Sequence, residues 1–292
     1  MAATVALLAN PLAGRGRGGR LAGPVREALA AAGLDVAVLS GGSGAESVAL
    51  AREAVSAGVD AVVAVGGDGL VHCAVQALAG TGVPLGIVPA GGGNDLAGEL
   101  GVPPDPREAV AVIAAGRARD VDLGRTDRGT WWAGVLNAGF DSQVVARAER
   151  MRRPRGPLRY DLAAYLEIAN LRPHPMRITL DGVTTEQPVT LVAVGNSPRY
   201  GGGMRIAPGA DLADGVFEVV IADAMSRATL ARLKPLVRAG THVRHPQVHV
   251  HRASAVTLDA PGLPAYADGE PLGVLPVTAT CVPAAIRVLV PY

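Results

Sequence analysis

The stretch DAVVAVGGDGLVHCA, residues 60–74, decides how the N-terminal half of this 292-residue chain folds. A short apolar run stops at two glycines, an aspartate and a third glycine, and a second apolar run follows. The first run has the length and the Val and Ala content of a buried strand. The glycine turn and residues 70–78 after it predict a helix. A strand that turns through glycine into a helix is typical of a βαβ unit.

The same alternation covers the first 124 residues. Apolar runs at TVALLA, DVAVLS and PLGIVPA alternate with Ala-rich stretches that predict helices over 19–32 and 46–57. Strands separated by helices indicate a parallel sheet with buried strands. After residue 124, runs such as MRITLDG and GVFEVVIAD alternate polar and apolar residues between DG, PG and GG pairs, which favours an antiparallel β-sandwich. We expect an α/β chain with one domain over 1–124, a second over 125–283, and a C-terminal segment, 284–292, that returns to the first.

Composition excludes several function classes. The 49% hydrophobic content is enough for a sizeable core, and 27 basic against 26 acidic residues leave no global field for nucleic acid. Lys234 is the single lysine, so P-loop and protein-kinase chemistry, which need a lysine near an N-terminal glycine loop, are excluded. Two cysteines, Cys73 and Cys281, make no disulfide framework. The N-terminal apolar run is broken by Asn10 and Pro11 before a signal peptide is complete, so we expect a cytoplasmic protein.

Three glycine-rich turns follow strands of the first half: NPLAGRGRGG (10–19), GGDG (66–69) and PAGGGND (89–95). In a parallel sheet all three lie at the carboxyl edge, where ligands bind. Glycines let backbone amides approach an anion, so this edge is expected to bind phosphate. Asp68 and Asp95 suit such an edge if they organise a divalent cation or take a proton from an acceptor, which indicates Mg²⁺-nucleotide chemistry. Each loop taken alone has a structural alternative: GGDG is an ordinary tight turn, and GGGND is a helix start with Asn94 as its cap.

A dinucleotide-binding pattern in the first loop is misleading. Gly14, Gly16 and Gly19 satisfy GxGxxG, and Asp35 follows at about the distance that such a fold requires. However, Asn-Pro-Leu-Ala separates the strand from the first glycine, and Asp35 precedes the second strand instead of ending it. The sequence therefore disfavours a dehydrogenase.

Two segments of the second half also hold acidic residues at strand ends, GGGMRIAPGADLADGVFEVV within 195–221 and AYADGEPL over 265–272. Taken with NPLAG, GGDG and PAGGGNDLAGELGVP, they resemble the diacylglycerol kinase catalytic family, the bacterial lipid kinases related to sphingosine kinases. The resemblance runs from about residue 4 to the C-terminus in the same order. It implies a phosphofructokinase-like α/β domain that binds ATP and Mg²⁺, followed by a β-sandwich, with a lipid hydroxyl phosphorylated in the cleft between them.

The resemblance also implies roles for particular residues. Glu270 matches the general base toward the acceptor hydroxyl, with Asp268 beside it, and Asp68 and Asp95 match the catalytic Mg²⁺ network. The residues expected to line the nucleotide are Asn10, Pro11, Gly14, Gly66, Gly67, Gly69, Leu70, Gly92 and Asn94. A second, structural metal of some bacterial members would fall on Asp211, Asp214 and Val216.

Two positions depart from the family pattern. Many bacterial members have threonine where this chain has Leu70 and Gly92. Losing a hydroxyl removes a phosphate or metal-water contact, typically worth about 0.5 to 1.5 kcal/mol, which weakens nucleotide binding without abolishing chemistry. Sphingosine kinases also carry leucine after GDG, so Leu70 does not mark an inactive enzyme.

The expected function is phosphoryl transfer from ATP to diacylglycerol or a similar lipid. An NAD kinase, which shares GGDG, is the enzymatic alternative, and a nucleotide- or lipid-binding relative without turnover is the other. The arginine-rich run RAERMRRPRGPLRY (147–160) is either exposed to solvent or docks the chain on the inner face of a membrane. His249 and His251 share a strand face, but a solvated basic strand is favoured there over a zinc site. Nucleic acid is not expected as a partner, and a homodimer is left open.

Overall fold

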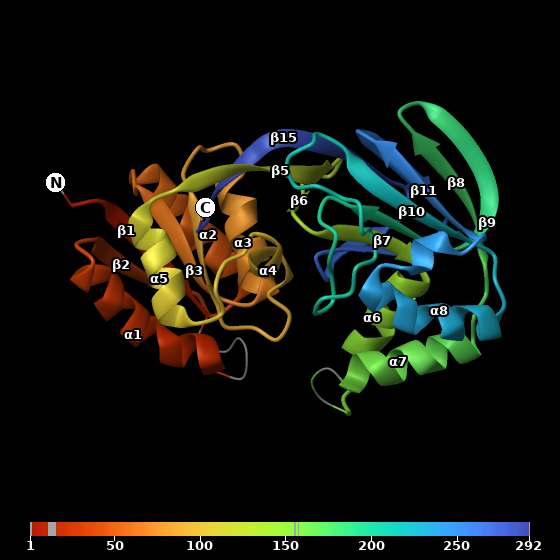
Figure 1. Cartoon of the computed structure of the whole chain (residues 1–292), viewed down its shortest axis with the longest axis horizontal. Helices are drawn as coiled ribbons and strands as arrows, with labels where there is room; N and C mark the ends of the chain where they lie inside the picture. The colour runs from red at the N-terminus through yellow and green to blue at the C-terminus, as the bar shows by residue number, and fades with distance from the viewer. Residues whose placement is uncertain (1, 11–15, 155, 157, 292) are drawn as a thin grey trace.

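Four parallel strands form the centre of the N-terminal domain (Figure 1). They are β1 (Thr4–Ala9), β2 (Asp35–Ser40), β3 (Ala61–Gly66) and β4 (Leu85–Pro89), in the spatial order β2-β1-β3-β4. Every residue of β3 and β4 is buried, as the continuous apolar runs predict. The structure is a computed structural model that describes residues 2–10, 16–154, 156 and 158–291.

Two pairs of helices cover this sheet. α1 (Arg17–Ala31) packs with α5 (Pro106–Ala115), α2 (Gly44–Ser56) packs with α3 (Asp68–Leu78), and the short α4 (Asp95–Glu99) follows β4. Local signals set the helix ends. The Ser43 hydroxyl accepts a hydrogen bond from the Glu46 amide at the start of α2 (3.2 Å), and Asp105 caps α5 ahead of Pro106.

The second domain is built on antiparallel strands, with β9 (Val183–Gly195) paired to β7, β8 and β10. The others that lie wholly within it are β7 (Val135–Gly139), β8 (His174–Leu180), β10 (Phe217–Asp223), β11 (Val248–Ala253), β12 (Ala255–Asp259), β13 (Pro264–Ala267) and β14 (Glu270–Val274). The Trp132 ring of β6 (Trp131–Trp132) stacks on Phe217 in the core, with 5.0 Å between ring centroids. The predicted fold class, an α/β domain followed by a β-sandwich-like domain, is confirmed.

Three helices cover one face of the second domain (Figure 1). They are α6 (Phe140–Arg150), α7 (Leu158–Ala169) and α8 (Arg227–Ala239). A separate apolar cluster lies beneath them, with contributions from Phe140 of α6, Ala164 of α7 and Leu230 of α8. None of the helices in the described part of the chain is both long enough and apolar enough to cross a membrane.

Two long antiparallel strands connect the domains, β5 (Ala118–Thr126) and β15 (Val277–Leu289). In Figure 1 they run side by side across the top of the molecule. The C-terminal end of β15 returns to the first sheet, where Val288 pairs in parallel with Leu85. The boundaries expected at 124/125 and 283/284 therefore lie inside continuous strands.

The buried side chain of Asp122 holds the middle of this connection. Its two carboxylate oxygens accept hydrogen bonds from the amides of Ala284 (2.8 Å) and Gly215 (2.7 Å). The pairing of β5 with β15 shifts register between Val282 and Ile286, so the Ala284 amide needs a partner other than the neighbouring strand. Asp122 supplies that partner.

Candidate functional site

The turns after β3 and β4 pack directly against each other at the carboxyl edge of the parallel sheet, as predicted. A methyl group on Gly67 would lie 2.8 Å from the Gly91 Cα, too close for any residue with a side chain. The end of β1 lies at the same edge, because a methyl group on Gly18 would be 3.2 Å from the Asn10 carbonyl oxygen. Pro11 and Gly14, predicted to line the nucleotide, lie outside the described residues.

Asp68 joins two of these turns. One carboxylate oxygen accepts a hydrogen bond from the Asn94 amide (2.8 Å) and the other from the Asp95 amide (2.7 Å). Burial raises the pKa of Asp68; the amide bonds oppose this, and the charge of Asp95 adds to it, so the net shift is upward. Each oxygen keeps a second lone pair for a further partner.

Asn94 shapes the third loop from within. Its backbone is in the left-handed region, at φ 56°, which asparagine tolerates better than most residues. Its side-chain oxygen accepts a hydrogen bond from the Gly91 amide (2.9 Å). The predicted nucleotide contact of Asn94 is therefore limited by the loop bonds that its amide and side chain already make.

Asp95 reaches across to the second domain. Its carboxylate oxygens accept hydrogen bonds from the amides of Gly202 (2.8 Å) and Gly203 (2.6 Å). Beside it, Glu99 of α4 forms an ion pair with Arg199 at 2.9 Å. The carboxyl edge of the first sheet is thereby tied to residues 199–203 of the second domain.

The glycines of the predicted rim fall into two groups. Methyl groups on Gly66 and Gly93 would lie 2.7 Å from the Leu70 Cδ2 and 2.6 Å from the Asp68 Oδ2, so these glycines serve packing. A methyl group on Gly92 would meet no atom within 4 Å, and one on Gly69 would have a single such neighbour, the Glu270 Oε1 at 3.7 Å. Gly69 and Gly92 therefore border the open side of the rim. The Leu70 side chain, in contrast, is buried in the core.

The ADGE turn of the second domain faces this rim. Asp268 and Gly269 have φ of 53° and 83° and form the two-residue turn between β13 and β14, the conformation for which Asp-Gly is preferred. The Asp268 oxygens accept hydrogen bonds from the amides of Ala133 (2.9 Å) and Gly134 (2.8 Å). Glu270 is exposed and lies opposite Gly69. Asp268 thus fixes the turn, and Glu270 is presented from it.

His72 and Gln76 connect α3 to the same turn, through contacts that the sequence did not indicate. The His72 Nδ1 lies 3.4 Å from the Asp268 Oδ2, and the Gln76 side chain bonds both the amide and the carbonyl of Trp131 (3.0 and 2.6 Å). Burial lowers the pKa of His72, but the hydrogen bond to Asp268 and the charges of Asp268 and Glu270 outweigh it and raise the net value. The spacing of four from Asp68 to His72 to Gln76 is the signal that marks this helix face.

Asp141 and Tyr200 form a second pair that the sequence did not indicate. The Tyr200 hydroxyl donates a hydrogen bond to the Asp141 Oδ2 at 2.6 Å. Burial raises the pKa of Asp141, and burial with the Asp141 charge raises the pKa of Tyr200 well above its usual value. Tyr200 also exchanges backbone hydrogen bonds with Met204 (3.0 Å each). The pair therefore anchors the loop whose amides hold Asp95.

The acidic residues of ADLADGV are placed differently. Asp211 is exposed and lies 3.6 Å from an Arg119 nitrogen, whereas Asp214 pairs with Arg252. The Asp214 Oδ1 also accepts a hydrogen bond from the Val216 amide (3.1 Å). Within the described ranges, no group of three or more His, Cys, Asp or Glu side chains is arranged to hold a metal ion. The second-metal set of Asp211, Asp214 and Val216 stays a prediction.

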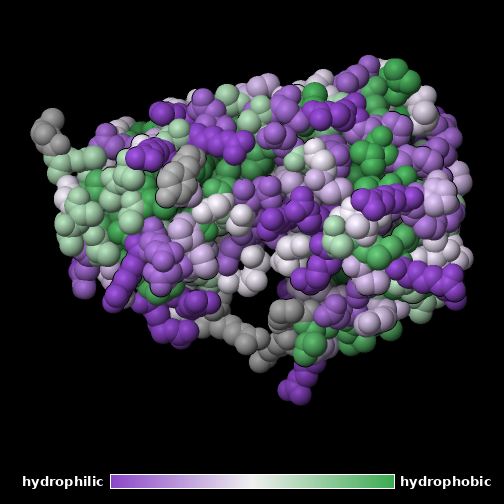
Figure 2. Space-filling view, viewed as in Figure 1, coloured by the Kyte–Doolittle hydropathy of each residue, from purple (hydrophilic) through white to green (hydrophobic). Residues whose placement is uncertain are grey.

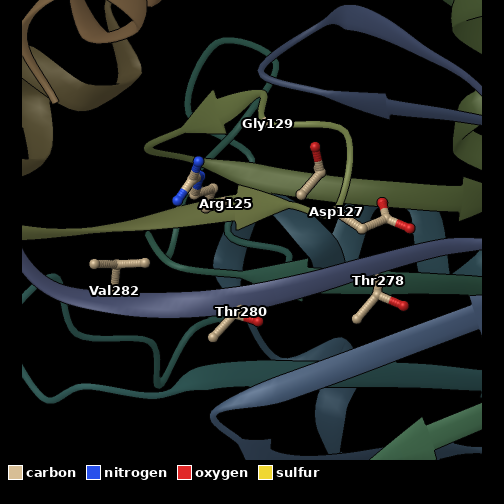
Figure 3. Close-up of a pocket in the computed structure, with 7 residues that line it drawn as sticks. Arg125, Asp127, Gly129, Thr278, Thr280 and Val282 are labelled. Atoms are coloured by element: carbon tan, nitrogen blue, oxygen red, sulfur yellow. The ribbon is translucent and has the colours of Figure 1, made fainter.

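Figure 2 shows an opening between the two halves of the molecule. A shallow pocket elsewhere, on the strands that connect the domains, is drawn in Figure 3 and contains none of the predicted site residues. It is lined by Arg125, Thr126, Asp127, Gly129, Thr278, Thr280 and Val282. The Arg125 guanidinium there lies over the Trp131 ring, 5.1 Å from its centroid.

Comparison with known proteins matches both halves of the chain. Residues 4–126 match the model of the diacylglycerol kinase catalytic domain, and residues 134–290 match that of the YegS C-terminal NAD kinase beta sandwich-like domain. A "Diacylglycerol kinase" of Mycobacterium tuberculosis is 43% identical over 98% of this chain and 95% of its own length. A "Probable lipid kinase YegS-like" of Chromohalobacter salexigens is 32% identical over 87% of this chain and 84% of its own.

Solved structures show the same fold. A diacylglycerol kinase structure from Bacillus anthracis superimposes with a TM-score of 0.74 at 20% identity, over 99% of this chain and 96% of that one. An NAD kinase from Archaeoglobus fulgidus, in complex with ATP, gives a TM-score of 0.56 at 12% identity, over 99% of this chain and 93% of that one. The likeness to the NAD kinase is one of fold alone, whereas the sequence matches are to lipid kinases. The chain therefore belongs to the diacylglycerol kinase family of lipid kinases.

Proposed function

We propose that this lipid kinase transfers the γ-phosphoryl group of ATP, with Mg²⁺, to a hydroxyl of diacylglycerol or a similar lipid. The observation that carries the proposal is the position of Glu270 of the second domain opposite Gly69 of the first, with the Oε1 only 3.7 Å from a methyl group built there. From this position the carboxylate would meet both a phosphate held at the glycine rim of the first domain and an acceptor bound by the second.

The first domain would hold the nucleotide phosphates. Gly69 lies in the first turn of α3, where unpaired amides and the helix dipole favour an anion. The open sides of Gly69 and Gly92 leave space for phosphate oxygens. Gly66 and Gly67 contribute through the packing that positions the rim. The phosphate role of Asn10, Pro11 and Gly14 remains a prediction.

Asp68 and Asp95 suit an ion that keeps part of its water shell. Their oxygens already accept amide hydrogen bonds, and each oxygen has a further lone pair that would accept a hydrogen bond from metal-bound water. Mg²⁺ usually retains several waters and binds through one or two carboxylates and the substrate phosphates. When bound, it would neutralise the charge that develops on the transferred group.

Glu270 would act as the general base. As the lipid oxygen bonds to the γ-phosphorus, the bond from phosphorus to the ADP oxygen breaks, and the hydroxyl proton passes to the Glu270 carboxylate. Asp268 contacts backbone amides and His72. It is therefore proposed as a positioning residue that holds the turn, and His72 and Gln76 keep α3 against it.

The proposal is tested with purified protein, Mg²⁺, [γ-³²P]ATP and a panel of acceptors: dioctanoylglycerol, a monoacylglycerol, sphingosine and NAD. We expect labelled phosphate on a lipid acceptor, and Glu270→Gln to lower kcat by about 10² to 10⁴-fold, the usual contribution of a general base. Glu53→Gln, at an exposed position of α2, is the matched control and should leave kcat unchanged. Transfer to NAD alone, or ATP binding with no transfer to any acceptor, would contradict the proposal.

The remaining predictions concern location and assembly. We propose a cytoplasmic chain that contacts the inner face of the membrane to reach its substrate, with no nucleic acid partner. A homodimer and a second metal at Asp211, Asp214 and Val216 are kept as predictions.

A further inference from the structure

Helix α7 exposes its large apolar side chains and buries small ones, the opposite of an ordinary surface helix. It buries the small residues Ala163 and Ala164 and exposes large apolar ones, with Leu158 67% and Tyr165 64% accessible. Amphipathic helices normally turn their large apolar residues toward the core. Ile168 is half-buried against the cluster beneath, but burying alanines in place of the leucines and tyrosines of this helix still forgoes hydrophobic stabilisation. The outward face of α7 therefore has the composition of a surface that meets an apolar partner.

The exposed residues form one continuous stripe. Leu158, Leu162, Tyr165 and Leu166 follow the spacing i, i+4, i+7 and i+8, which places them on one helix face. The neighbouring α8, which packs against α7, exposes Leu236 as well. Figure 2 shows apolar atoms over α7 at the lower edge of the molecule. We call these five residues the α7 stripe.

Basic residues flank the α7 stripe. Arg152 and Arg153 are exposed just before α7, and Arg232 and Arg238 are exposed on α8. Two of the acidic side chains nearby are paired with basic ones, Glu167 with Arg147 and Asp161 with Lys234 (3.5 Å), whereas Glu149 accepts a hydrogen bond from the Tyr266 hydroxyl (3.0 Å) and is outnumbered by the four arginines. The surface around the stripe is therefore positively charged.

The α7 stripe lies on the same side of the molecule as the opening between the domains. In Figure 1 the N-terminal ends of α1 and α7 approach each other along the lower edge, and in Figure 2 the opening lies just above them. Arg17 and Arg20, in the first turn of α1, are exposed on the opposite flank. Apolar and basic groups therefore lie along the same edge of the molecule as this opening.

We infer that the α7 stripe is the surface that inserts into the interface of an anionic lipid bilayer, with the arginines at its flanks contacting lipid headgroups. This inference rests on the proposed function, because it explains how a membrane-resident acceptor is brought to the site. Interfacial helices combine leucine and aromatic residues on one face with arginine and lysine at its border. A second copy of the chain is a poorer occupant, because a two-fold axis at the stripe would bring like-charged arginine segments together.

The test is co-sedimentation of the purified full chain with vesicles, without ATP. The vesicles contain phosphatidylcholine alone or phosphatidylcholine with phosphatidylglycerol. We expect the chain to bind the anionic vesicles, and the triple variant Leu158→Gln, Leu162→Gln, Tyr165→Gln to bind them at least about tenfold more weakly, because three apolar side chains are lost. The matched control Val38→Gln, Val183→Gln, Val274→Gln changes three exposed valines elsewhere and should bind within twofold of the original chain.

The arginines give a separate expectation. Arg152→Gln and Arg153→Gln should each weaken binding to anionic vesicles by about fivefold and leave binding to neutral vesicles unchanged. Unchanged binding by the α7 triple variant, or no binding of the original chain to anionic vesicles, would overturn the inference. The inference would also be overturned if sedimentation equilibrium showed that the original chain is a dimer and the α7 triple variant a monomer, while both bind vesicles equally.

Activity measurements separate this inference from the proposed function. With monomeric dioctanoylglycerol the α7 triple variant should keep the original kcat, and with diacylglycerol in anionic vesicles its rate should fall about tenfold. Vesicle binding that depends on the stripe, without transfer to any lipid, would support the docking surface and contradict the proposed kinase reaction. Equal loss of activity on both acceptors would contradict docking as the role of the stripe.

Discussion

Two pairs of aspartates occupy opposite electrostatic settings in this chain. Asp68 and Asp95 accept hydrogen bonds from four backbone amides. Asp211 and Asp214 lie against the guanidinium groups of Arg119 and Arg252. Amides neutralise a carboxylate only in part, whereas an arginine supplies a full positive charge. We therefore expect a divalent cation to bind at the first pair and to compete with arginine at the second.

Burial sharpens this difference. The pKa of Asp68 is raised by burial, with the nearby Asp95 charge adding to the effect, so its negative charge is costly without a cation. Asp211 is exposed, where an ion pair with arginine contributes little to stability. The role of an acidic residue in a motif therefore depends on the groups that contact its carboxylate more than on its position in the motif.

The largest expected effect is on activity at the first pair. Asp68→Asn removes a charge and turns an amide group toward the Asn94 and Asp95 amides, so kcat should fall by about 10³-fold, as for loss of one preorganised electrostatic element. Steady-state kinetics with dioctanoylglycerol measure it, and circular dichroism checks the fold. A fall of less than tenfold in a folded variant would refute a role for this carboxylate in phosphoryl transfer.

Asp122 tests the same kind of contact through stability. Like Asp68 and Asp95, it accepts hydrogen bonds from backbone amides, but its side chain is buried. Asp122→Ala leaves the Gly215 and Ala284 amides without acceptors and should cost roughly 2 to 4 kcal/mol in free energy of unfolding. Asp120→Ala, two residues away on the exposed face of β5, should cost about 0.5 kcal/mol or less. Urea unfolding measures both, and equal costs would show that the connection is not held by Asp122.

A third effect tests whether Gly93 is needed to keep the Asp68 carboxylate in its position. Gly93→Ala places a methyl group 2.6 Å from the Asp68 Oδ2, whereas Gly92→Ala meets nothing within 4 Å of the new carbon. Displacing the carboxylate should lower kcat/KM by about 10 to 100-fold, the cost of misplacing a reactive group by about 1 Å. The Gly92 variant should fold as stably as the original chain. Loss of stability in the Gly92 variant, or full activity in the Gly93 variant, would break the account of the rim.

The pH dependence follows from the raised pKa of Asp68. Protonation removes the charge that the site needs, and the Glu270 base must be ionised as well, so kcat/KM should fall by at least about tenfold per pH unit below that pKa. Because the shift is upward, the acid limb should have its midpoint above 3.8, the ordinary value for aspartate. Measurements from pH 4 to 8, with fluorescence to confirm folding, test this. A midpoint at 3.8 or lower would contradict the shift.

The smallest effect is expected at the second pair. Asp214→Asn loses an ion pair with Arg252 but keeps an oxygen for the Val216 amide, so activity should change less than about threefold and stability by about 1 kcal/mol or less. Kinetics across a range of Mg²⁺ concentrations provide the measurement. A marked rise in the Mg²⁺ requirement would restore the second-metal prediction.

Much of the site could be predicted from sequence, because its parts are local motifs at one sheet edge. The buried run before GGDG predicts β3, and the topology of parallel strands brings Asp68 and Asp95 together. The partners of Asp95 could not be predicted, because Gly202 and Gly203 lie 107 and 108 residues away in another domain. The hydrogen bonds of Gln76 to Trp131, and the arginines that contact Asp211 and Asp214, also join residues far apart in the chain, so they could not be predicted either.

Other structural roles were not predicted from the sequence. No role was assigned to Asp122, although it stands between two apolar residues, Val121 and Leu123, that are buried in the structure. The sequence of residues 160–171 has the pattern of an amphipathic helix, but that pattern does not say which face is buried. Only packing shows that alanines face the core and the α7 stripe faces outward.

The most direct test of the central claim is ATP binding measured by isothermal titration calorimetry with and without Mg²⁺. The chain is compared with its Asp68→Asn and Asp214→Asn variants. The account predicts that Mg²⁺ tightens ATP binding about tenfold or more in the original chain and in Asp214→Asn, a gain of about 1.4 kcal/mol, and that Asp68→Asn loses this gain. Retention of the gain in Asp68→Asn, or its loss in Asp214→Asn, would contradict it.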